Sequence, residues 1–111
     1  MKRTVVWSNS ARDEFLAILR FIAESNPDAA ARVAETIDGV VATLGDMATG
    51  RSGRVTGTYE KVVPGLPYIV AYALDDQPGR RRVAVLHVIH GARDWPDEGW
   101  PASRPSGMRA P

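Results

Sequence analysis

Two histidines and an arginine stand close together in the second half of the chain, where their side chains could carry chemistry. His87 and His90 precede Gly91, and Arg93 follows it. A histidine can gain or lose a proton near neutral pH, whereas an arginine keeps its positive charge. We therefore regard His90, which lies beside the turn and close to Arg93, as the candidate for acid–base chemistry.

The spacing of the two histidines argues against a metal site. Residues three apart on a strand point to opposite faces, so His87 and His90 cannot share a metal ion without a bend between them. The chain contains no other histidine and no cysteine. We predict no metal site and no cofactor.

A second group of basic residues comes earlier in the chain. Arg51 and Arg54 lie between residues 45 and 57, a stretch rich in Gly, Ser and Thr that predicts a mobile loop. Such a loop could present both guanidinium groups to a target or to a protein partner.

The strand predicted after this loop adds an aromatic residue to the basic group. Tyr59 and Lys61 follow Arg54 closely, and Tyr59 is the one aromatic residue interleaved with these cations, as nucleic-acid surfaces require. Glu60 beside Lys61 is expected to be an exposed strand residue. Trp95 is more typical of a core or interface anchor than of a base-stacking platform.

The segment that must hold the histidines is a β-branched run. Residues 83–89 have the composition and length of a buried strand, and Gly91 permits the turn that ends it. We interpret this strand as the centre of the fold. Residues 3–7 predict a further, short strand.

Two helices are predicted between these strands. Apolar residues recur at helical spacing over residues 11–22, after a cap at Ser8 or Ser10. A second helix begins with Asn26 as its cap. Gly39 is its weak point, because a glycine inside a helix lowers its stability by roughly 1 kcal/mol relative to alanine. The connection is short, so the helices should be antiparallel neighbours.

The remaining elements form a strand meander. Residues 58–63 and 68–74 predict two strands joined by a Pro64–Gly65 turn, and residues 75–79 predict a polar loop into the central strand. The fold class is therefore α+β: an N-terminal strand, an antiparallel helical hairpin, and a three-stranded antiparallel meander, in the order β-α-α-β-β-β.

The strand pattern predicts apolar residues on both faces of the sheet. Successive residues of a strand point to opposite faces, and here both sets are apolar. On the strand 68–74 the two sets are Tyr68, Val70 and Tyr72, and Ile69, Ala71 and Ala73. On the central strand they are Val83, Val85 and Ile89, and Ala84, Leu86 and Val88. Two helices cover only one face. A second apolar surface is expected, covered by the C-terminal tail or by a partner.

Length and composition indicate one small domain. The chain has 111 residues, and we expect a single domain over residues 1–96 and an irregular Pro-rich tail over residues 97–111. No apolar run approaches the length of a membrane span, and the N-terminus lacks the pattern of a signal peptide. With no cysteine in the chain, a cytoplasmic protein is expected.

The net charge of +1 conceals an uneven distribution. Residues 1–48 carry five basic and seven acidic side chains, whereas residues 49–95 carry seven basic and four acidic ones. This local excess of three positive charges is compatible with a nucleic-acid surface or with an acidic protein partner.

The order of motifs resembles a known family. The helical hairpin is followed by Gly53–Arg54, by the strand Tyr-Ile-Val-Ala-Tyr at 68–72, and by His-Gly-Ala-Arg-Asp-Trp at 90–95. Together these resemble the RelE/ParE superfamily of toxins from bacterial type II toxin-antitoxin systems, over residues 3–96. The resemblance implies a small cytoplasmic toxin that is neutralised in a complex with a cognate antitoxin.

The superfamily divides by target. RelE-like members cut messenger RNA on the ribosome and ParE-like members poison DNA gyrase. Arg93 matches the arginine after the last strand of RelE-like toxins, but Tyr68 and Tyr59 stand where arginines are common, and no tyrosine follows Tyr72. The resemblance therefore favours a ParE-like gyrase inhibitor that is not a hydrolytic enzyme.

Two alternatives stay open. One is a ribosome-dependent endoribonuclease with Arg93 and His90 as catalytic residues, and the other is an inactive homologue that only binds antitoxin. Whichever target is correct, we expect an extended antitoxin segment with apolar anchors and with acidic residues near Arg51, Arg54 and Arg93. The residues expected to bind target or antitoxin are Arg51, Arg54, Tyr59, Lys61, His87, Arg93 and Trp95.

Overall fold

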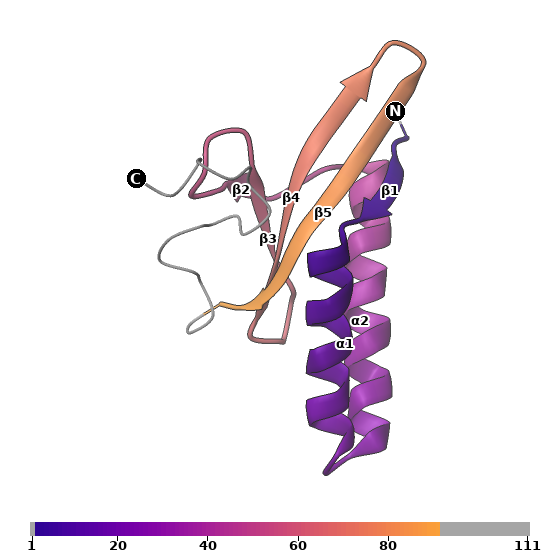
Figure 1. Cartoon of the computed structure of the whole chain (residues 1–111), viewed down its shortest axis with the longest axis vertical. Coiled ribbons are helices and arrows are strands. Elements are labelled where there is room, and N and C mark those ends of the chain that lie inside the picture. The colour runs from indigo at the N-terminus through magenta and orange to yellow at the C-terminus, as the bar shows by residue number, and fades with distance from the viewer. Residues whose placement is uncertain (1, 92–111) are drawn as a thin grey trace.

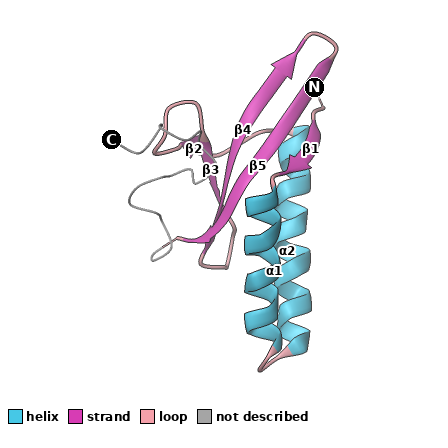
Figure 2. Ribbon diagram, viewed as in Figure 1, coloured by secondary structure: helices cyan, strands magenta, loops and turns pink. Residues whose placement is uncertain are grey.

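The computed structural model describes residues 2–91. The elements are β1 (Thr4–Trp7), α1 (Asn9–Ala23), α2 (Pro27–Asp46), β2 (Arg51–Ser52), β3 (Tyr59–Val62), β4 (Tyr68–Gln77) and β5 (Arg80–His90). The strands form one five-stranded sheet, and the two helices run antiparallel beside it (Figures 1 and 2). The predicted α+β order is confirmed, with the short β2 as an addition.

β5 is the strand that connects the parts of the fold. In the sheet order β1-β5-β4-β3-β2, it pairs in parallel with β1 and antiparallel with β4. Both helices also pack against it. The interpretation of this strand as the centre of the fold is confirmed.

Local sequence signals fix the helix ends. Ser8 caps α1 by accepting a hydrogen bond from the amide of Ala11, and Asn26 caps α2 in the same way. α2 ends at Asp46, two residues into the stretch 45–57 that was predicted as a loop, and buried Gly45 lets its last turn approach β1 closely. A Cβ at Gly45 would lie 2.7 Å from the carbonyl oxygen of Arg3.

The main core lies between the helices and the sheet. It contains Ala11, Ile37, Val41, Leu44, Val63, Val70, Tyr72, Val83, Val85 and Val88. Each of these residues is buried. The helical face of the sheet therefore supplies most of the apolar burial that stabilises the described residues.

A bulge in β5 changes the predicted alternation. Ala71 pairs with His87 while Tyr72 pairs with Val85, so Leu86 is an extra residue. Val88 therefore joins the helical core, and Ile89 lies on the opposite face. The predicted grouping of Ile89 with Val85 was wrong, because the inserted residue shifts every later side chain to the other face.

The second face of the sheet carries a small buried cluster. Ile69, Ala71 and Ile89 are at most 7% exposed there, and Val55 packs against them. The tail that was expected to cover this face lies outside the described residues. The exposed large apolar side chains are Val6, Leu16, Phe21, Met47 and Val62.

The turns follow the predicted chemistry, with one difference in length. Gly65 has the positive φ of 78° that the Pro-Gly turn requires. The polar segment 75–79, predicted as a loop, is mostly strand: β4 runs to Gln77 and β5 begins at Arg80. Neither helix within residues 2–91 is long and apolar enough to cross a membrane.

Candidate functional site

The predicted basic group lies at the β2–β3 edge of the sheet, where it surrounds a buried carboxylate. Arg51 donates hydrogen bonds to Oε1 of Glu60 at 2.9 and 3.2 Å, and the backbone amide of Arg54 donates to Oε2 at 3.1 Å. Glu60 is only 4% exposed, so its predicted exposure was wrong. Its carboxylate ties the loop to the sheet and neutralises the charge of Arg51.

The other two predicted residues of this group point to the helical face. Tyr59 stacks on Tyr72 with ring centroids 5.5 Å apart, and Lys61 donates to the hydroxyl of Thr49 at 2.9 Å. Burial raises the pKa of Tyr72 above 10.0, so its hydroxyl stays protonated and donates to the carbonyl of Thr49. Tyr59 and Lys61 therefore form part of the packing between β3 and the segment after α2.

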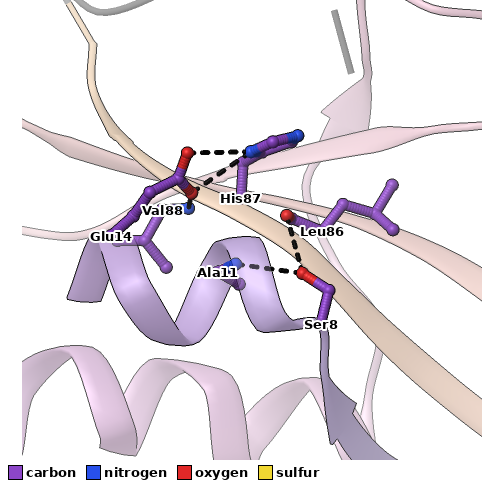
Figure 3. Close-up of polar contacts among 6 residues, drawn as sticks. All are labelled: Ser8, Ala11, Glu14, Leu86, His87 and Val88. Carbon is purple, nitrogen blue, oxygen red and sulfur yellow. Dashed lines mark hydrogen bonds and ion pairs between the residues drawn. The ribbon is translucent and has the colours of Figure 1, made fainter. Parts of the chain in front are cut away.

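His87 lies in the same cross-strand row as Arg51 and Glu60, on the other side of β4, and contacts α1. Its Nδ1 lies 2.9 and 3.2 Å from the two carboxylate oxygens of Glu14, and one of these oxygens accepts the backbone amide of Val88 at 3.0 Å (Figure 3). His87 is 1% exposed. The prediction of a surface or interface position for this histidine was wrong, because Glu14 satisfies the ring inside the protein.

Glu14 was not singled out from the sequence, although a signal was present. It follows Ala11 by three residues and precedes Ile18 by four, so it falls at the border of the apolar face of α1. A carboxylate at such a position needs a partner within the fold. Ser8 acts beside it, donating to the carbonyl of Leu86 while it caps α1 (Figure 3).

His90 lies on the opposite face of β5 from His87, as predicted. It forms an edge-on contact with Tyr68, its partner on β4, with ring centroids 5.9 Å apart. Arg93 and Trp95 lie outside the described residues. Within residues 2–91, no three His, Cys, Asp or Glu side chains gather as metal ligands would.

A hollow opens between α1 and the edge of β5. It has a volume of about 260 Å³ and is lined by Glu14, Ala17, Ile18, Val88 and Ile89. β1 pairs with β5 only as far as Val85, so no described strand covers this edge next to the hollow. An apolar side chain from a partner could enter here beside Ile18.

An exposed apolar residue on α1 lies near this hollow. Phe21 is 73% exposed and follows the lining residue Ala17 by one helical turn. So large an apolar side chain in water favours a partner that covers it. We call the hollow together with Phe21 the α1 surface.

The chain matches a model of the ParE toxin of the type II toxin-antitoxin system parDE over residues 5–95. This chain belongs to the ParE toxin family. The match spans most of β1, both helices and every later strand, so the family and the observed fold agree.

Individual relatives agree with this assignment. The ParE-family chain is 34% identical over 96 residues to Y4kP of Sinorhizobium fredii, which is named as a toxin, covering 86% of this chain and 95% of that protein. Its fold resembles the chromosomal ParDE system of P. aeruginosa, with a TM-score of 0.72 and 17% identity over 80% of this chain and 96% of that one. It also resembles the YoeB/ParE toxin of Agrobacterium tumefaciens, with a TM-score of 0.55 and 16% identity over 78% and 96% of the chains.

Proposed function

We propose that this ParE-family toxin inhibits DNA gyrase and is neutralised by a cognate antitoxin that covers the α1 surface. Membership of the ParE toxin family supports a role as a toxin, and the ParE-like pattern of the sequence supports gyrase as its target. Cutting RNA would instead require an acid, a base and several cations that converge on one phosphate.

The distribution of charged groups within residues 2–91 is the observation that carries the choice of target. Arg51 pairs with buried Glu60 at the β2–β3 edge, whereas His87 pairs with Glu14 at the other side of β4. His90 packs on Tyr68 on the helical face. Arg51 and His87 share the opposite face, but each is already engaged by a carboxylate, and His90 lies apart from them. This arrangement supports a protein-binding toxin over a nuclease.

The hollow supports the α1 surface as the antitoxin site. A segment lying along α1 could place one apolar side chain between Ile18 and Val88 and cover Phe21 with another. The basic group at the β2–β3 edge, which we call the basic edge, is less suited to binding the antitoxin than the sequence suggested, because Glu60 already neutralises Arg51. Apolar burial on α1 would then dominate the affinity of the complex.

Induction of the toxin in growing cells tests the target. We expect loss of negative supercoiling in a reporter plasmid, together with growth arrest, and no new codon-phased ends when primer extension maps messenger RNA. Codon-phased ends with normal supercoiling would favour the ribosome-dependent nuclease. Normal growth with a folded, soluble protein would favour the inactive homologue.

A further inference from the structure

β4 and β5 continue beyond the rest of the sheet as a two-stranded ribbon. The pairing of β3 with β4 ends at Tyr72, and the pairing of β1 with β5 begins at Arg82. Residues 75–77 therefore pair only with residues 80–82, and this ribbon projects from the end of the molecule away from the helical turn (Figure 1). The side chain of Arg80 on one face is 56% exposed and that of Arg81 on the other is 34% exposed, so a ligand can reach both faces.

The ribbon, together with Arg3 just before β1, carries more positive than negative charge. The charged groups are the guanidiniums of Arg3, Arg80, Arg81 and Arg82 and the carboxylates of Asp75 and Asp76. Four positive and two negative groups leave a local charge of +2. The excess belongs to a segment that neither the α1 surface nor the basic edge includes.

These charges are organised in the same way on the two faces. Asp75 lies 3.8 Å from Arg80 and also forms a short ion pair with Arg82, while Asp76 lies 2.9 Å from Arg3 and 3.5 Å from Arg81. Neighbouring residues on a strand point to opposite faces, so each face holds one carboxylate between two guanidiniums.

The two aspartates hold the arginines in place. Hydrogen bonds from Arg82 and Arg3 lower the pKa of Asp75 and of Asp76, respectively, below 3.8, so both carboxylates are charged at neutral pH. Their charge fixes guanidiniums that would otherwise sample many rotamers. Arg3 and Arg82 are held by these hydrogen bonds, whereas Arg80 and Arg81 lie 3.8 and 3.5 Å from the same carboxylates.

We propose that the ribbon binds the phosphate backbone of double-stranded DNA by entering its major groove. A major groove admits a two-stranded β-ribbon, and the phosphates on its two sides would meet cations on both faces of the ribbon. A flat acidic protein surface would engage only one of these faces. The ribbon and the α1 surface lie at opposite ends of β5, so one can be occupied without the other.

Salt-dependent binding of the purified toxin to a fluorescein-labelled 20-base-pair DNA duplex tests this assignment. We expect the logarithm of the association constant to fall linearly with the logarithm of salt concentration. The variant Arg80→Gln/Arg81→Gln should reduce the slope by about 2, since each lost phosphate contact removes about 0.9. The control Arg12→Gln/Arg20→Gln removes the same charge from exposed positions of α1 and should leave the slope unchanged.

Two further arms separate groove binding from general attraction of anions. Gln77→Lys adds a cation at the tip of the ribbon and should tighten binding, with a fold checked by circular dichroism. An RNA duplex of the same sequence has a major groove too narrow for the ribbon and should bind at least tenfold more weakly. The proposal would be overturned if the toxin bound the RNA duplex equally well, or if it failed to bind DNA at low salt. It would also be overturned if the α1 control lost as much of the salt slope as the ribbon variant, or if polyglutamate at equal charge concentration displaced the DNA.

Discussion

Glu14 reaches from α1 past the edge of β5 to the ring of His87, with 2.9 Å between Oε2 and Nδ1. The same carboxylate accepts the amide of Val88, which no described strand pairs on that side. This one side chain therefore satisfies a backbone group at the sheet edge and a ring that is 1% exposed. It also borders the hollow on the α1 surface.

Replacing Glu14 should weaken the fold. Glu14→Ala leaves the amide of Val88 and the ring of His87 without this acceptor, and we expect a loss of about 1–3 kcal/mol in the free energy of unfolding. Glu14→Gln retains one acceptor oxygen and should lose less. Urea denaturation measures both, with Glu35→Ala on the exposed side of α2 as a control. Equal stability of Glu14→Ala and the control would contradict this role.

Arg51 should contribute more to stability than its exposure suggests. Arg51→Ala leaves the buried carboxylate of Glu60 without its charged partner, and the expected cost is about 1–3 kcal/mol. Lys61→Ala removes only an exposed hydrogen bond to Thr49 and should cost less than about 0.5 kcal/mol. Thermal unfolding of the two variants compares them, and a larger loss for Lys61 would refute the difference.

The two glycines of α2 should respond to alanine in opposite ways. A Cβ at exposed Gly39 meets nothing within 4 Å, so Gly39→Ala should stabilise the protein by about 1 kcal/mol. At Gly45 the new Cβ would lie 2.7 Å from the backbone of Arg3, so Gly45→Ala should destabilise it. Denaturant midpoints measure both changes, and a shift of the same sign at both positions would be evidence against this packing.

The ribbon should make stability depend on acid. The pKa values of Asp75 and Asp76 are lowered in the folded protein, so their ion pairs stabilise it fully above the ordinary value of 3.8 and are lost as the pH falls through the lowered folded values. Asp75→Asn/Asp76→Asn should therefore flatten the fall in stability at and below pH 3.8. Circular dichroism during an acid titration measures this, and parallel curves for wild type and variant would exclude the ion pairs as the cause.

Much of this fold could be predicted because its signals are local. The caps at Ser8 and Asn26, the turn at Gly65 and the β-branched run of β5 each act within a few residues. The bulge at Leu86 could not be predicted, since a strand's register depends on its partner strand. The sequence pattern therefore assigned Ile89 to the wrong face.

The candidate site was predicted less well, for a related reason. The sequence identified Arg51, His87 and His90, but their partners are distant in sequence or opposite in chemical type: Glu60 was expected in solvent, and Glu14 lies 73 residues from His87. Charged residues therefore seemed available to a target when the fold had already paired them. The α1 surface arises from the meeting of α1 with β5, which no single stretch of sequence encodes.

The most direct test of the proposed function is gyrase supercoiling of relaxed plasmid with purified toxin, measured with and without the antitoxin from the neighbouring open reading frame. Ala17→Arg places a charge in the hollow, and Ala31→Arg makes the same change on exposed α2. For each variant, the inhibition of supercoiling by the toxin without antitoxin is the reference value. We predict that wild type inhibits supercoiling, that antitoxin restores it for wild type and Ala31→Arg, and that Ala17→Arg needs at least tenfold more antitoxin. Unimpaired supercoiling with wild-type toxin, or equal neutralisation of the two variants, would contradict the account.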